Sequence, residues 1–359
     1  YKHLGTYFAF VVSYDSNQVN VFEVCSDRDI KKLDKNNCYA TDSIYNVIWK
    51  PLESVIDSAS TVYFIPDGEL YSLALESADL TQKRIYHRLS SSRQICLERD
   101  SFLGKDAVVY GGIDYDVDSC GQKMNGTPQK CTLRSLRETL EFLPGSQKEA
   151  KEISGILSQN GFKVKLLTGQ SATEEAFKKL SDTSVNVLHV STHGYCWSQQ
   201  KYATMVTNNP LLNQGDLYQV DEDLAMIRTG LMFAGANNAF INKVGDTGLD
   251  DGILTAKEIC NLNLQNVNLV VLSACKSGLG EVSRDGVYGL QRAFKKAGVK
   301  SIVMSLWAID DSVTQDFMVH FYKGLASGLS KEKALLQAKI LIKEKYPHSN
   351  DWAAFVLLD

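Results

Sequence analysis

The sequence lacks the features that would assign it to several specialised classes of protein. Its 359 residues contain no apolar run that approaches the ~20 residues of a membrane-spanning helix, so no membrane contact is expected. The formal net charge is only −4, from 38 Lys and Arg against 42 Asp and Glu, which gives no general attraction to nucleic acid. No GxGxxG or Walker-type phosphate-binding loop is present. These absences favour a globular protein whose function depends on a few specific side chains.

Paired cysteines are also absent. The eight cysteines include no CxxC pair and no Cys/His set with the spacing of zinc ligands, so neither a metal nor another cofactor is expected. They are too dilute for a disulfide scaffold, which favours reduced thiols in a cytoplasmic protein. The first residue is Tyr1 rather than Met, and we therefore expect the chain to be a fragment of a longer protein.

A regular alternation of strands and helices begins at about residue 135. Near-continuous apolar strands separated by amphipathic helices indicate a mostly parallel sheet flanked by helices, and therefore an α/β fold. The helix expected at 146–161 begins with Ser146 as its N-cap, with Glu149 three residues on. The other expected strands are 163–169, 185–192, 229–236, 267–275 and 301–308, and the other expected helices are 173–180, 255–262, 286–298, 312–326 and 331–345.

The preceding residues show strands and helices in mixed order, which predicts a separate region at 1–134 and a second domain at 135–359. A polar stretch at about 114–132 is typical of a flexible loop at a domain boundary. The expected elements of the first region are a hairpin of 7–15 with 18–24, a helix within 42–56, and buried strands at 60–68 and 106–112.

Two of the apolar strands end in reactive side chains. His193 follows the strand in "VNVLHVSTHG", and Cys275 follows the strand in "VNLVVLSACKSG". Functional groups of an open parallel sheet gather at the carboxyl ends of its strands, and neighbouring strands are ~5 Å apart. A nearby imidazole lowers the pKa of a thiol and can protonate a leaving amine, so this pair predicts a cysteine nucleophile with a histidine base.

A structural reading of each residue is also open. A buried cysteine is commonly an inert small hydrophobe, and His189, inside the same strand, is expected to point into the packing. Cys196 lies in the same loop as His193 and is therefore a weaker candidate nucleophile than Cys275. The joint placement of His193 and Cys275 at strand ends, each before a glycine-containing turn, favours the catalytic reading.

Longer stretches around these residues carry a family resemblance. They are "VNVLHVSTHG", "DDGILTAKEICNLNLQNVNLVVLSACKSGLGE", "DGVYGLQRAFKKAGVKSIVMSLWAIDD" and "DWAAFVLLD", with weaker matches from Val62 onwards. In these stretches the sequence resembles the CHAT family of caspase-like cysteine peptidases, which is related to separase and more distantly to caspases. The resemblance implies a caspase-like sandwich, preceded by a smaller, inactive caspase-like half that would correspond to residues 1–134.

The resemblance also implies a mechanism. His193 would be the base and Cys275 the nucleophile of a dyad, and the backbone amides of Gly194 and Cys275 would form the oxyanion hole. The activity implied is that of an endopeptidase that cleaves a protein substrate. Relatives are commonly fused to an N-terminal repeat or sensor module and held inactive until an activating partner binds, and bacterial defence or signalling is the implied setting.

The substrate pocket remains open among several candidates. Ser273, two residues before Cys275, carries no charge, which argues against the aspartate specificity of caspases. Asp310 and Asp311 could supply the acidic pocket of a separase-like enzyme, but Asp311-Ser312 is also typical of a helix cap. Asp250 and Asp251 are a second acidic candidate or only a turn. A neutral pocket near Trp307 and Val313 is the remaining alternative.

A function from another class is also compatible with the sequence. A caspase-like scaffold could keep the His193 and Cys275 side chains while binding a partner protein and cleaving nothing. Selective reaction of Cys275 with a peptidyl electrophile would distinguish the peptidase from the scaffold.

Overall fold

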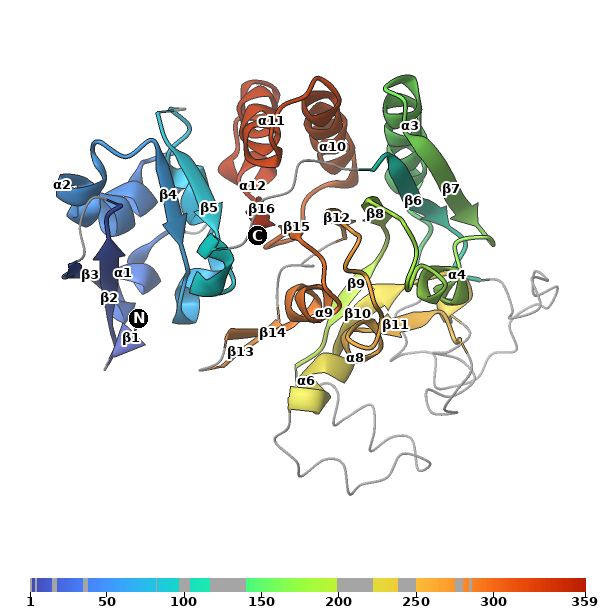
Figure 1. Cartoon of the computed structure of the whole chain (residues 1–359), viewed down its shortest axis with the longest axis horizontal. Helices are drawn as coiled ribbons and strands as arrows, with labels where there is room; N and C mark the ends of the chain where they lie inside the picture. Colours follow the sequence, from blue (N-terminus) through green and yellow to red (C-terminus); the bar gives the residue numbers. More distant parts are fainter. Residues whose placement is uncertain are drawn as a thin grey trace. The chain divides into compact units, whose positions relative to one another are not determined.

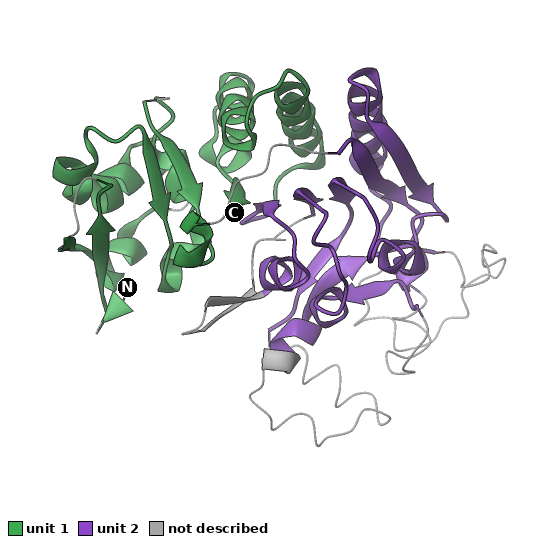
Figure 2. Ribbon diagram, viewed as in Figure 1, with its two compact units in different colours: residues 1–99, 282–287, 308–359 green, residues 100–281, 288–307 purple. Residues whose placement is uncertain are grey.

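The structure is a computed structural model that describes residues 2–3, 5–14, 18–34, 38–81, 83–96, 104–116, 140–198, 222–237, 250–274, 280–283 and 286–359. Cys275 and most of the expected loops at 114–132 and 197–226 lie outside the described residues. The chain forms two compact units, and both are discontinuous in sequence (Figure 2). Unit 1 comprises residues 1–99, 282–287 and 308–359, and unit 2 comprises 100–281 and 288–307. The boundary expected between residues 134 and 135 lies outside the described residues and stays a prediction.

The core of unit 2 is a parallel sheet, as the apolar strands predict. Its strand order is β15-β12-β8-β6-β7, and every recorded pairing among these strands is parallel (Figure 1). All residues of β15, β12 and β8 are buried, which explains the continuous apolar character of these strands. The bounds are β6 Asp106–Ile113, β7 Lys163–Gly169, β8 Val187–Ser191, β12 Leu269–Ser273 and β15 Ser301–Ser305.

Helices cover both faces of this sheet, so the α/β fold with flanking helices is confirmed. Tyr110 of β6 packs against Phe177 on one face, while its neighbour Gly111 faces Ser146 on the other, since successive strand residues point to opposite faces. Figure 1 shows α3 on one side of the sheet and α4, α8 and α9 on the other. The bounds are α3 Pro144–Gln159, α4 Glu174–Lys178, α6 Glu222–Ile227, α8 Ala256–Ile259 and α9 Leu290–Lys296.

Three local expectations for unit 2 are wrong. The α3 helix begins at Pro144, because proline fits the first helical turn, and Ser146 therefore lies inside the helix instead of capping it. Residues 229–236 do not join the parallel sheet, since β10 (Thr229–Met232) lies between β9 (Gly194–Cys196) and β11 (Ile253–Thr255) in an antiparallel sheet. The helix expected at 286–298 begins at Leu290, after β14 (Gly286–Gly289), which is paired with β13 (Gly280–Ser283).

Unit 1 combines the beginning and the end of the described chain. Its parallel strands have the order β4-β5-β16, where β4 is Thr61–Phe64, β5 is Ile85–Arg88 and β16 is Phe355–Leu358. The helices that follow unit 2 in the sequence are α10 Asp311–Ala326, α11 Lys331–Lys345 and α12 Ser349–Trp352. Earlier helical segments are α1 Asp27–Lys32, η1 Tyr45–Trp49, η2 Lys50–Leu52, α2 Glu53–Ile56, η3 Gly68–Ser72, η4 Leu75–Ala78 and η5 Ser92–Cys96.

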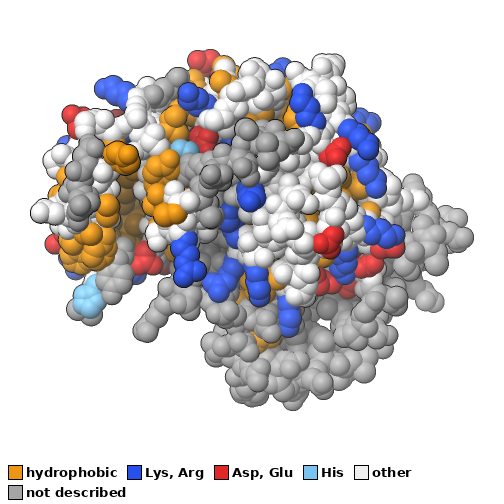
Figure 3. Space-filling view, in the orientation of Figure 1, with side chains coloured by type: hydrophobic (Ala, Val, Ile, Leu, Met, Phe, Trp, Pro, Cys, Tyr) orange, Lys and Arg blue, Asp and Glu red, His pale blue; other side chains and the backbone are white. Residues whose placement is uncertain are grey.

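The predicted N-terminal hairpin is confirmed and exposes an apolar face. β2 (Thr6–Val12) pairs antiparallel with β3 (Val19–Ser26) and with the short β1 (Lys2–His3). Phe10 is opposite Val21, and the two side chains are 58% and 56% exposed. Figure 3 shows hydrophobic side chains gathered over this hairpin. None of the described helices is long and apolar enough to cross a membrane.

Candidate active site

A chain of hydrogen bonds fixes the backbone of His193 at the carboxyl end of β8. The His193 amide donates to Tyr115 Oη at 3.3 Å, and Tyr115 Oη lies 2.9 Å from Thr192 Oγ1. Thr192 uses its single hydroxyl hydrogen to donate to the Met232 carbonyl, so the tyrosine hydroxyl must donate to Thr192. The Met232 amide donates back to the His193 carbonyl at 2.9 Å. Buried chains of this kind strengthen one another and leave the histidine little backbone freedom.

The imidazole of His193 is oriented by a backbone carbonyl. Nε2 lies 2.8 Å from the Glu141 carbonyl oxygen, and the His193 ring packs at 5.1 Å, centroid to centroid, against Tyr115. A carbonyl oxygen can only accept a hydrogen bond, so Nε2 carries the hydrogen in the neutral ring. Nδ1 is then the nitrogen with the free lone pair, and it is the atom that can act as a base.

Asn237 holds the backbone next to Glu141. This buried side chain accepts from the Leu140 amide at 2.8 Å and donates to the Leu140 carbonyl at 3.0 Å. The same amide group donates to Asp116 Oδ1 at 2.8 Å, so Asn237 links the chain on both sides of residues 117–139. Sequence reasoning missed Tyr115, Glu141 and Asn237. Only the strand end "YGGIDYD" gave a signal for the first of these, and nothing local marks a backbone carbonyl as a functional group.

The register of the sheet relates the two predicted catalytic positions. β8 and β12 are adjacent and parallel, and Ser191 is the register partner of Ser273. His193 and Cys275 each follow one of these paired serines by two residues. Cys275 itself lies outside the described residues, so the structure gives no distance between its sulfur and the imidazole.

The other residues predicted in this part of unit 2 occupy defined positions. Gly194 is the first residue of β9, next to His193. Ser273 is the last residue of β12, and its buried hydroxyl has no hydrogen-bond partner among the described residues. His189 is fully buried, with Nε2 2.8 Å from Glu149 Oε1, which confirms that it points into the packing. Trp307 is half-buried just beyond β15.

The acidic candidates for a substrate pocket have structural partners. Asp310 is the N-cap of α10 and accepts hydrogen bonds from the Ser312 amide and hydroxyl, which lower the pKa of Asp310. Asp311 is the first residue of that helix, within unit 1. Asp250 pairs with Lys178 at 2.8 Å, and burial raises the pKa of Asp251, which accepts from the Ile253 amide. The structure thus places a capping residue at 310, one position before the cap considered from the sequence.

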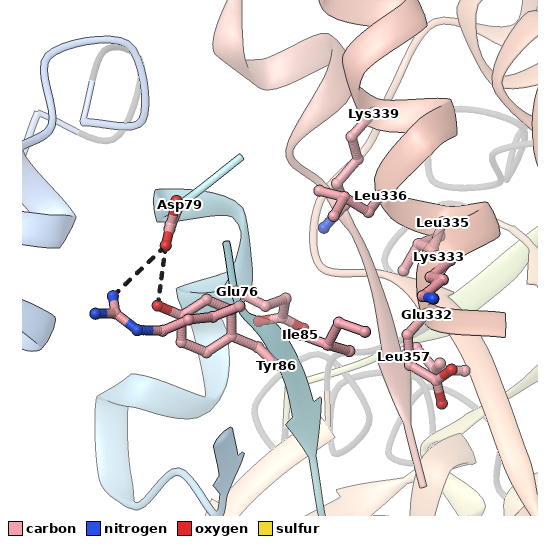
Figure 4. Close-up of a pocket in the computed structure, with 11 residues that line it drawn as sticks. Glu76, Asp79, Ile85, Tyr86, Glu332, Lys333, Leu335, Leu336, Lys339 and Leu357 are labelled. Atoms are coloured by element: carbon pink, nitrogen blue, oxygen red, sulfur yellow. Dashed lines mark hydrogen bonds and ion pairs between the residues drawn. The ribbon is translucent and has the colours of Figure 1, made fainter. Parts of the chain in front are cut away.

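A polar cavity lies in unit 1, lined by residues of β5, η4 and α11 (Figure 4). Tyr86 donates to Asp79 at 3.2 Å, and Arg84 lies 3.9 Å from the same carboxylate. Lys339 also lines the cavity, and burial lowers the pKa of this lysine to about 8. The volume is about 40 Å³, which is room for only a few water molecules. This cavity is too small for a peptide substrate.

The sequence comparisons decide the family. A sequence profile of the CHAT domain matches residues 40–358. The chain belongs to the CHAT family. Among curated proteins it is similar to tetratricopeptide repeat protein 28 of Homo sapiens, with 24% identity over 336 residues. It is also similar to the Mus musculus protein of the same name, with 26% identity over 223 residues. These matches cover 88% and 60% of this chain but only 13% and 8% of the relatives.

The fold of this CHAT protein resembles that of a solved cysteine proteinase. The crystal structure of the Arg-specific cysteine proteinase gingipain R superposes with a TM-score of 0.50 and 10% identity, covering 88% of this chain and 66% of that one. The Drosophila initiator caspase Dronc gives a TM-score of 0.36 with 10% identity, covering 72% of this chain and 81% of that one. At such low identity the gingipain likeness shows the fold alone.

Proposed function

We propose that this CHAT protein is a cysteine endopeptidase in which Cys275 is the nucleophile and His193 the base. The register of β8 and β12 carries the proposal. Ser191 and Ser273 are paired on adjacent parallel strands, and such strands are ~4.8 Å apart. Two residues beyond this pair stand the imidazole and the thiol of the candidate dyad. The orientation of His193 by the Glu141 carbonyl supports the same assignment, since it directs the basic Nδ1 away from that carbonyl.

The proposed reaction uses the groups of this chain only. His193 Nδ1 takes the proton of the Cys275 thiol, and the thiolate attacks the scissile carbonyl carbon of a protein substrate. The backbone amides of Gly194 and Cys275 would stabilise the oxyanion of the tetrahedral intermediate. The protonated imidazole then gives its proton to the departing amine as the peptide C–N bond breaks. A water molecule, deprotonated by His193, hydrolyses the thioester and regenerates the thiol.

The specificity is proposed to depend on an uncharged pocket. Ser273 carries no charge and lies buried at the carboxyl end of β12, two residues before Cys275. Asp310 is engaged as a helix cap, and Asp250 is paired with Lys178. Trp307 of unit 2 remains a candidate wall of the pocket. We therefore favour a neutral P1 side chain over an Asp or Arg side chain.

Regulation by another module or partner is part of the proposal. The curated relatives are named for tetratricopeptide repeats, and this chain spans only 13% and 8% of their lengths. A repeat module of this kind could hold the peptidase inactive until a partner binds. A cytoplasmic setting belongs to the proposal, and it is consistent with Cys25, Cys96 and Cys196, three described cysteines that are free thiols.

The test is covalent labelling with peptidyl electrophiles that differ at P1 (Arg, Leu, Met and Asp), read out by intact mass and peptide mapping. We expect a single adduct on Cys275, fastest with Leu or Met, and none in Cys275→Ser. His193→Ala should slow labelling by at least about tenfold, because it removes the group that activates the thiol. Cys196→Ser is the matched control, since this exposed thiol is three residues from His193 and should not affect labelling.

The competing function is a scaffold that binds a partner and cleaves nothing. It predicts that the electrophiles label exposed thiols such as Cys196 and Cys96 without preference for Cys275. Labelling that is spread over several cysteines and is indifferent to His193→Ala would contradict the peptidase and favour the scaffold.

A further inference from the structure

Three side chains of unit 1 lie close together and have no role in the proposed peptidase reaction. His87 lies in β5, Glu332 in the first turn of α11, and Asp359 directly after β16. His87 Nδ1 is 3.2 Å from Asp359 Oδ2 and 3.4 Å from Glu332 Oε1. One ligand atom from each residue lies within 4.8 Å of the other two. An imidazole nitrogen and two carboxylate oxygens thus face a common centre.

The charge at this centre favours a cation. The three side chains are only 9%, 13% and 13% exposed, so water screens them poorly. Two carboxylates with one imidazole carry a net charge of −1 or −2, depending on whether the ring is protonated. Nδ1 can hold at most one hydrogen and so can make one good hydrogen bond, yet two carboxylates face it. The imidazole therefore faces one carboxylate more than a simple His–Asp pair has.

The separations match those of metal ligands. Zinc binds imidazole nitrogen and carboxylate oxygen at roughly 2.0–2.2 Å, so neighbouring ligand atoms of a tetrahedral site are roughly 3.3–3.5 Å apart. The distances of 3.2 and 3.4 Å from His87 Nδ1 agree with this spacing. Mixed imidazole and carboxylate ligands suit Zn²⁺ and Mn²⁺ better than the oxygen-seeking Ca²⁺.

Rigid elements hold the three groups in place. The Asp359 amide donates to the Arg88 carbonyl at 2.9 Å, which continues the parallel pairing of Leu358 with Arg88. Ser330 caps α11, so that Glu332 lies in a fixed helical turn. The ring of Tyr63 stacks on His87 with centroids 4.8 Å apart. Ligands that are ordered before the ion arrives lose little freedom on binding it.

We propose that His87, Glu332 and Asp359 bind a divalent transition-metal ion such as Zn²⁺ or Mn²⁺. The ion would connect β5, the residue after β16 and the first turn of α11, and would so stabilise unit 1. A water molecule would take the fourth position of a tetrahedral site. The role is structural and independent of the candidate dyad.

The test is titration of the full 359-residue chain with Zn²⁺ after removal of metal by a chelator, with bound metal counted by elemental analysis and calorimetry. Thiols and the candidate dyad can also bind Zn²⁺, so the decisive quantity is the difference between variants. We expect His87→Gln to bind one equivalent less than the wild type. Glu332→Gln should lower the affinity for this Zn²⁺ ion by at least roughly tenfold. Loss of a residue that only hydrogen-bonds to a metal ligand already lowers metal affinity by that factor.

His348→Gln is the matched control, because His348 is an exposed histidine of unit 1 that is not one of the three clustered residues. It should bind as many equivalents as the wild type. Zn²⁺ should also raise the melting temperature of the wild type and of His348→Gln by the same amount, and that of Glu332→Gln by less. Equal stoichiometry in the wild type, His87→Gln and Glu332→Gln would overturn the proposal, as would the absence of any bound Zn²⁺. Either result would leave the labelling of Cys275 unaffected.

Discussion

At the scale of single residues, two buried tyrosines near His193 in the fold differ in the hydrogen bonds of their hydroxyl groups. Tyr115 accepts from the His193 amide and belongs to the buried hydrogen-bond chain. Tyr110, five residues earlier, is also buried, but its hydroxyl has no partner among the described residues. Burial without a partner raises the pKa of Tyr110 and keeps its hydroxyl protonated. The two residues therefore form a natural pair for testing what positions the histidine.

We expect Tyr115→Phe to slow the labelling of Cys275 by roughly fivefold, since a buried hydrogen bond is worth ~1 kcal/mol. Hydrogen exchange of the His193 amide should become faster in this variant. Tyr110→Phe is the control: it should leave the labelling rate unchanged and raise the free energy of unfolding by up to ~1 kcal/mol, because it removes an unpaired buried hydroxyl. Equal losses of labelling in both variants would show that the hydrogen-bond chain does not position His193.

At the scale of elements, hydrogen bonds of Ser146 connect α3 to the parallel sheet, although the sequence predicted a different role for this residue. Ser146 was expected to cap the helix, but it lies two residues after Pro144, the first residue of α3, and is buried. Its hydroxyl accepts from the Gly112 amide at 2.9 Å and donates to the Ser191 carbonyl at 2.8 Å. One side chain thus connects α3 to the ends of β6 and β8, close to His193.

Ser146→Ala should lower the free energy of unfolding by about 2 kcal/mol, because it leaves a buried amide and a buried carbonyl without partners. The matched control is Ser154→Ala on the same helix, where the serine hydroxyl is buried with no partner among the described residues. That change should be neutral or slightly stabilising, since alanine is the better helix former. Urea denaturation of both variants measures the difference, and a Ser146→Ala protein as stable as Ser154→Ala would contradict the bridging role.

At the scale of the whole molecule, unit 1 is assembled from the two ends of the described chain, and a buried lysine takes part in joining them. Lys339 of α11 is fully buried and donates to Ser77 of η4 at 2.6 Å. Glu76 is paired with Arg88 at 2.8 Å and partly offsets the burial of the lysine charge. Burial nevertheless dominates and lowers the pKa of Lys339 to about 8.

This shift makes the stability depend on pH. Between about pH 8 and pH 10.4 the unfolded chain holds the Lys339 proton more tightly than the folded protein does, so the free energy of unfolding rises with pH. We expect the wild type to gain stability relative to Lys339→Met between pH 7.5 and pH 9.5, as measured by urea denaturation. Lys343→Met, at an exposed position of the same helix, should show no such gain relative to the wild type. A constant difference between the wild type and Lys339→Met would mean that the lysine titrates as in water.

The sequence by itself determined the α/β class, most of the strands and helices, and the placement of His193 at a strand end. These follow from local patterns, because a strand buried on both faces must be apolar along its length and a polar residue marks where it stops. The antiparallel pairing of β10 was not predicted, because the apolar pattern of three or four buried residues is the same in parallel and antiparallel sheets.

Only the tertiary structure decided which strands are neighbours and which distant groups meet. It brought Ser191 into register with Ser273, and it placed the Glu141 carbonyl on the imidazole of His193. It also brought together His87 and Asp359, which are 272 residues apart, in a cluster that no sequence motif predicts. Such contacts depend on the order of strands and the packing of helices, and these are properties of the whole chain that no local pattern encodes.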